Sequence, residues 1–72
     1  MDLIEIEAKR HLSREEAADW LRNLADSLSR HNDIEFEREG VRYEVAVPDE
    51  LLMEIELEIG DDGTELEIEF HW

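Results

Sequence analysis

The chain has 72 residues, no cysteine and a formal net charge of −15 at pH 7, and it is 42% hydrophobic and 40% charged. This length allows one small domain with a barely sufficient core, and the lack of cysteine excludes disulfides and thiolate metal sites. The hydrophobic content excludes an acidic disordered tail, and the negative charge argues against nucleic acid as a partner because an acidic surface repels phosphate.

The balance of charges predicts a salty environment. Six of the seven basic residues are arginine, and the isoelectric point is about 4.3. At about 1 M salt the Debye length falls to ~3 Å, which largely removes repulsion between surface carboxylates. We therefore expect adaptation to a cytosol of molar salt rather than a specific acidic binding face. No apolar run approaches the roughly 20 residues of a membrane helix and no signal-peptide core is seen, so we expect a cytoplasmic location and no membrane partner.

The first two predicted elements are a strand and a helix. Residues 2–9 alternate between apolar and charged side chains, which predicts a strand. Ser13 and Glu16 have the spacing of a capping box and predict a helix over residues 14–30. Trp20 lies at the edge of the apolar stripe of this helix. The stripe itself consists of Ala17, Ala18, Leu21, Leu24, Ala25 and Leu28.

A first hairpin is predicted over residues 34–47. Glu39-Gly40 is a plausible two-residue turn, although glutamate is a poor choice where φ is positive. Pro48 cannot donate to a strand ladder and marks the next connection. The register that follows pairs Ile34 with Val45, Phe36 with Tyr43, and Glu37 with Arg42.

A second hairpin is predicted over residues 51–72, where glutamate and apolar residues alternate strictly. The strongest turn signal is Asp62-Gly63, but a register centred on Asp61-Asp62 preserves the same two faces, so alternation alone leaves both open. Either register opposes glutamates across the strands, which destabilises a sheet at ordinary salt. The acidic face consists of Glu54, Glu56, Glu58, Glu65, Glu67 and Glu69.

Together these elements predict a single α+β domain over residues 1–72 in the order β-α-β-β-β-β. We expect a five-stranded, mainly antiparallel sheet with one helix packed on its apolar face, and a first strand parallel to the second through a right-handed crossover. Five strands span roughly 20–24 Å whereas a helix is about 10–12 Å across, so the helix leaves apolar surface uncovered. A homodimer is the simplest cover for that surface.

The chain resembles the amphi-Trp domain family, which is common in haloarchaea and scattered through bacteria. The resemblance rests on the helix HLSREEAADWLRNLADSL, with Ser13 and Trp20, and on the strand TELEIEFHW, which ends in Trp72. It covers essentially all 72 residues. What it implies is a small domain of unknown function, frequent in halophiles, with no catalytic residues to carry over.

The residue types do not predict an enzyme or a cofactor. Catalytic carboxylates need environments that separate their pKa values, whereas these glutamates are alike and lie on an open face. No nucleophile elbow surrounds the serines, which all fall on the helix or its cap. Glu54, Glu69 and His71 are candidate ligands for a metal ion, but a histidine solvated among surface glutamates is the simpler interpretation, so no metal site is assigned.

The predicted function is therefore an uncharacterised, salt-adapted protein-interaction or accessory module without catalysis, working as a homodimer or with an unknown protein partner. The alternative is a domain that binds cations, metals or a basic partner in DNA-mimic fashion through its glutamate-rich face. Molar salt would screen the attraction on which mimicry depends. The aromatic residues are expected to form the core rather than a ligand pocket.

Overall fold

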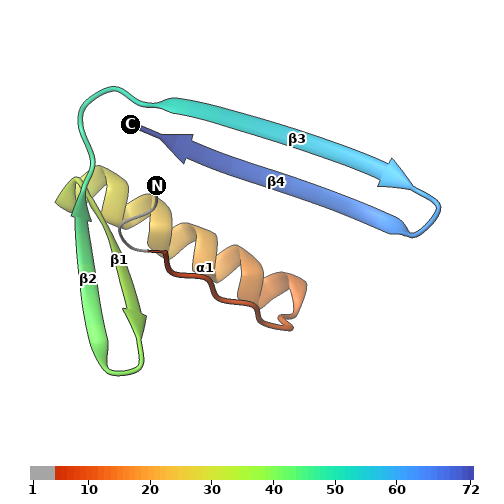
Figure 1. Cartoon of the computed structure of the whole chain (residues 1–72), viewed down its shortest axis with the longest axis horizontal. Helices are drawn as coiled ribbons and strands as arrows, with labels where there is room; N and C mark the ends of the chain where they lie inside the picture. Colours follow the sequence, from red (N-terminus) through yellow and green to blue (C-terminus); the bar gives the residue numbers. More distant parts are fainter. Residues whose placement is uncertain (1–4) are drawn as a thin grey trace.

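One helix and two β-hairpins make up the chain in a computed structural model that describes residues 5–72 (Figure 1). The α+β class and the antiparallel pairing of strands are as predicted. The elements are α1 (Arg14–Asp26), the π-helical turn η1 (Ser27–His31), β1 (Asp33–Arg38), β2 (Val41–Ala46), β3 (Leu52–Gly60) and β4 (Gly63–His71).

The predicted five-stranded sheet is wrong, because the strands form two separate two-stranded sheets, β1–β2 and β3–β4. Residues 5–9 of the predicted first strand are not in a strand, and residues 2–4 lie outside the described residues. This segment meets the first hairpin through one hydrogen bond instead, from Arg38 Nη1 to the carbonyl oxygen of Glu7 at 3.0 Å. Each hairpin is closed by a two-residue turn, whereas β2 is joined to β3 by five residues that include Pro48. A short local turn forms a ladder more readily than a longer connection whose proline lacks an N–H donor.

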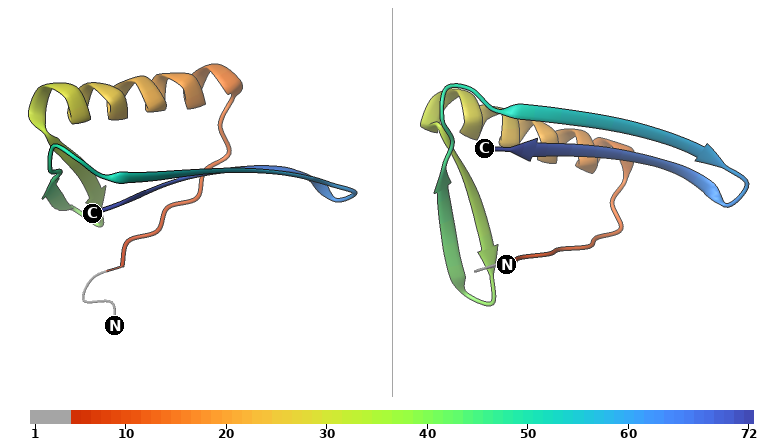
Figure 2. Two further views of the ribbon diagram at one scale, coloured as in Figure 1. Left: turned by 90° about the horizontal axis from the view of Figure 1, so that it is seen from above. Right: turned by 45° about the horizontal axis from the view of Figure 1, so that its top comes forward.

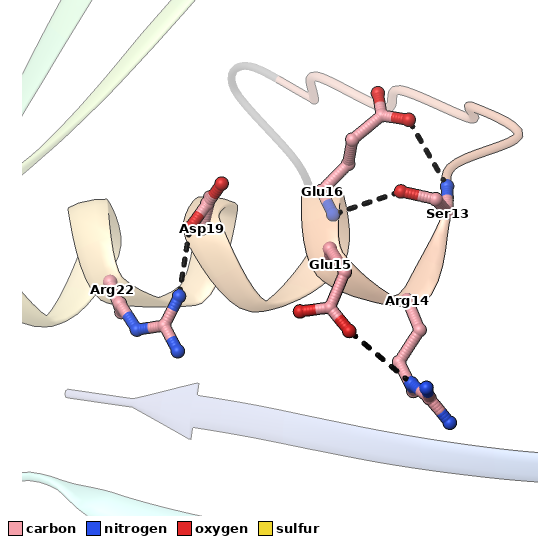
Figure 3. Close-up of polar contacts among 6 residues, drawn as sticks. All are labelled: Ser13, Arg14, Glu15, Glu16, Asp19 and Arg22. Atoms are coloured by element: carbon pink, nitrogen blue, oxygen red, sulfur yellow. Dashed lines mark hydrogen bonds and ion pairs between the residues drawn. The ribbon is translucent and has the colours of Figure 1, made fainter.

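The N-terminus of α1 has the predicted capping box (Figure 3). The backbone N–H of Glu16 donates to Ser13 Oγ at 3.1 Å, and the N–H of Ser13 donates to Glu16 Oε1 at 3.4 Å. Two donors that a helix start otherwise leaves unpaired are thereby satisfied. The ion pairs of Arg14 with Glu15 and of Arg22 with Asp19 in the same view are exposed and add little stability.

The helix ends one residue later than predicted and widens in its last turn, η1. Asn32 follows it with φ at 54°, the left-handed conformation that asparagine tolerates at a helix C-terminus. The N–H of Asn32 donates to the carbonyl oxygen of Ser27, and its own carbonyl accepts from the N–H of Val47 at 2.8 Å. The end of the helix is therefore tied to the residue that follows β2.

The register of the first hairpin is confirmed. Both residues of its turn have positive φ, 53° at Glu39 and 78° at Gly40, as a type I′ turn requires. The pairs are Ile34 with Val45, Phe36 with Tyr43, and Glu37 with Arg42.

The second hairpin takes the register centred on Asp61-Asp62, since Gly60 pairs with Gly63 across the turn. The Asp62-Gly63 turn is therefore not formed, and Gly63 begins β4 with φ at 140°, which favours glycine. The pairs on the apolar side are Met53 with Phe70, Ile55 with Ile68, Leu57 with Leu66, and Ile59 with Thr64.

The helix covers less of the apolar surface than predicted. Leu24 and Leu28 are half-buried where the helix meets β1, as are Ile34 and Phe36. The second hairpin extends well away from this contact (Figures 1 and 2). No residue of the described range 5–72 is fully buried. The expectation that aromatic residues form an enclosed core is therefore wrong for this single chain.

Candidate interaction surface

One side of the second hairpin is a row of apolar side chains, most of them exposed. Because side chains alternate across a strand, the same parity that places glutamates on one side places only apolar residues and Thr64 on the other. Ile59 is 77% exposed, and Ile55 and Leu57 are each 60% exposed. We call this side the apolar face; its members are Met53, Ile55, Leu57, Ile59, Leu66, Ile68 and Phe70.

Helix α1 stands on the same side as the apolar face, beside β4 (Figure 2). Between them lies an open cleft of about 310 Å³ rather than a packed contact. Ile68, which lines this cleft, is 45% exposed, less than the residues of β3. Leu66, which also lines the cleft, is 60% exposed, so the helix leaves much of the apolar face open on β4 as well as on β3. The cleft is lined by Leu12, Ala17, Trp20, Leu21, Leu66 and Ile68.

The other side of the hairpin, the glutamate face, opposes like charges in three successive cross-strand pairs: Glu54 with Glu69, Glu56 with Glu67, and Glu58 with Glu65. The crowding raises the pKa of Glu67 above its ordinary value of 4.5, first through a hydrogen bond with Glu65 and then through the negative charges of Glu65 and Glu56. Such pairs destabilise the hairpin unless salt ions screen the charges or protons neutralise them.

The first hairpin shows the contrasting arrangement, in which glutamates are neutralised. Arg42 Nη2 lies 2.6 Å from Glu35 Oε1 and 3.1 Å from Glu44 Oε1. The hydrogen bond with Glu35 and the two carboxylate charges hold the pKa of Arg42 above its usual value. The glutamate face of the second hairpin contains no arginine or lysine, so no basic side chain of this hairpin neutralises it in the same way.

The candidate metal ligands lie close to one another in the pairing scheme but do not form a cage. Glu54 pairs directly with Glu69, whereas His71 pairs with Leu52. Across residues 5–72, no group of three or more histidine, aspartate or glutamate side chains is arranged to hold a metal ion. Of the serines considered as nucleophiles, Ser13 accepts the capping hydrogen bond of the helix.

Sequence reasoning found the two faces but missed the cleft beside the helix. Leu21 was assigned only to the apolar stripe of the helix, yet it lines the cleft together with Leu12 and Trp20. Trp20 does lie at the rim, 46% exposed, as predicted. No local pattern signals the cleft, because it depends on where a hairpin more than forty residues along the chain comes to rest.

Comparison with known proteins identifies the family. Within the described residues, no helix is long and apolar enough to cross a membrane. Searches among curated proteins and among solved structures gave no match. The family model of the Amphi-Trp domain matches residues 1–72, the whole of the chain. The chain therefore belongs to the Amphi-Trp domain family.

Proposed function

We propose that this chain is a protein-interaction module without catalytic activity, and that the apolar face is the surface it presents to a protein partner. The observation that carries the proposal is the row Ile55, Leu57 and Ile59, which is 60–77% exposed on a regular nine-residue strand. Single exposed hydrophobic residues are normal, but a contiguous row of exposed apolar residues marks an interaction site.

The glutamate face has a different role in this proposal. It keeps one side of the hairpin solvated in a cytoplasm of high salt, so that the hairpin has only one side on which an apolar partner can dock. The distribution of charge supports this division, because all six glutamates of the hairpin share one face. An open, solvated face also lacks the burial that separates pKa values in acid–base catalysis.

Photo-crosslinking from each face tests the proposal. A benzophenone amino acid replaces Ile59 on the apolar face or, as the matched control, Glu58 on the glutamate face of the same strand. We expect protein adducts from position 59 and few from position 58 when the cells that make the protein are irradiated. Adducts mainly from position 58 would transfer the function to the glutamate face, as a basic-partner binder. Adducts from neither position would overturn an interaction role.

A further inference from the structure

The accessible surface of the chain is too large for a small domain that functions alone. The chain exposes 7055 Å², whereas a compact monomer of 8.5 kDa exposes about 4,700 Å². Folding therefore buries only about 43% of the surface of the unfolded chain, against about 60% for a typical domain of this size. The excess of about 2,400 Å² per chain has the scale of an obligate protein interface.

Building on the proposed function, we propose that the partner is a second copy of this chain, stacked with its apolar face on the apolar face of the first. Two copies related by a two-fold axis would cover the exposed apolar face of each copy with one and the same contact, which removes part of the excess surface from both chains.

The charge distribution fits a second copy better than a basic protein. The apolar face carries no charged residue that would select a basic partner, and the charges that would do so lie on the opposite side of the hairpin. A second copy offers a matching face, with strands of the same nine-residue length. Its own glutamates point outward, away from the interface.

Face-to-face stacking also keeps the like charges of the two copies apart. Stacked sheets lie about 10 Å from each other, so the two glutamate faces would be roughly 20 Å apart. Pairing β4 edge to edge would instead bring two glutamate rows to within about 5 Å across the new ladder. The exposed edge strands thus have an electrostatic barrier to pairing, whereas the apolar faces carry no charge that would oppose stacking.

The two geometries differ in how ionic strength controls assembly. At 0.01 M salt the Debye length is about 30 Å, so charges roughly 20 Å apart still repel; at 0.15 M it is about 8 Å and they do not. Face-to-face dimers should therefore tighten at least about tenfold between 0.01 and 0.15 M KCl and then level off. Edge-to-edge dimers should continue to tighten toward about 1 M, where the Debye length is ~3 Å.

Sedimentation equilibrium of the purified chain, from about 1 to 100 μM protein and from 0.01 to 2 M KCl, tests the inference. We expect a species of twice the 8.5 kDa chain mass, with its dissociation constant levelling off near 0.15 M. A folded monomer at every concentration and salt would overturn it. A dimer that tightens up to molar salt would also overturn the stacked geometry.

A matched pair of variants locates the interface. Leu57→Thr with Leu66→Thr places β-branched residues, which favour strands, at both positions and removes the central apolar pair, so the dissociation constant should rise at least about 100-fold. Glu58→Gln, on the opposite face, should leave the dissociation constant unchanged at 0.15 M KCl and lower it at 0.01 M KCl. If the double variant loses its circular dichroism spectrum, Ile59→Thr at the rim should weaken the dimer about tenfold instead. Dimerisation at wild-type strength by the threonine variants would overturn the inference.

The crosslinking experiment separates this inference from the proposed function on which it rests. An adduct from position 59 at twice the chain mass, containing only this sequence, supports both. An adduct from position 59 to a different protein, together with a monomeric purified chain, overturns the proposal that the partner is a second copy and supports the interaction role. A monomeric chain without adducts overturns both.

Discussion

We expect the cap at Ser13 to contribute a large share of the stability of α1, because this helix buries so little of its surface. The Ser13 hydroxyl accepts from the N–H of Glu16 at 3.1 Å, and no residue of α1 is fully buried. Ser13→Ala should lower the free energy of unfolding by about 1 kcal/mol, measured by urea denaturation with helical circular dichroism. Ser29→Ala is the control, since that hydroxyl only donates to the Asp26 carbonyl at 3.4 Å, and should change stability by less than about 0.5 kcal/mol. Equal effects would show that the cap contributes nothing specific.

The pKa of Glu67 predicts an unusual response to acid. The folded hairpin raises this pKa, chiefly through the hydrogen bond with Glu65, so the folded state binds a proton more tightly than the unfolded chain. Linkage then requires stability to rise as pH falls from 7 through the raised pKa, with the gain complete below the ordinary value of 4.5. Thermal midpoints at low KCl should show this rise in the wild type, and Glu67→Gln should reduce it. Identical pH profiles for the two proteins would contradict the role of Glu67.

At the scale of elements, the turn of the first hairpin is strained by its sequence. Glu39 has φ at 53°, a left-handed conformation that costs a residue with a Cβ roughly 1–2 kcal/mol and that asparagine tolerates better. Glu39→Asn creates the preferred Asn-Gly turn and should raise the free energy of unfolding by about 0.5–1 kcal/mol. Urea denaturation measures the change, with Glu50→Asn in the β2–β3 connection as a near-neutral control. A loss of stability in Glu39→Asn would mean that the glutamate side chain itself supports the turn.

The elements also show which parts of the fold were predictable from sequence. The capping box and the first hairpin involve residues close along the chain, so local chemistry determines them. The two faces of the second hairpin follow from alternation, but its register does not, because the Asp61-Asp62 and Asp62-Gly63 turns preserve the same faces. The prediction of a single sheet was wrong because alternation indicates which side of a strand is apolar but not which strand lies beside it. The apolar face was therefore predictable, whereas the cleft between α1 and β4 was not.

For the whole molecule, the net charge of −15 and the large exposed surface lead us to expect that salt is the main control of stability. Two repulsions act over different distances. The glutamate faces of two stacked copies would be roughly 20 Å apart, whereas opposed glutamates within one hairpin are about 5 Å apart. The repulsion between the two copies is screened by about 0.15 M salt. The repulsion within one hairpin is screened only as the Debye length approaches ~3 Å near 1 M.

The folding midpoint should therefore continue to rise with KCl after the molecular mass has levelled off. Tryptophan fluorescence of Trp20 and Trp72 follows unfolding, and measurements from 0.01 to 3 M KCl should show a gradual gain that persists beyond 0.15 M. Glu56→Gln with Glu58→Gln removes a charge from two of the three opposed pairs and should flatten the part of the curve above 0.15 M. A midpoint that levels off together with the mass would show that the opposed glutamates cost the hairpin nothing. A gain that saturates with micromolar divalent ions would instead identify the glutamate face as a cation site, since general screening does not saturate at such concentrations.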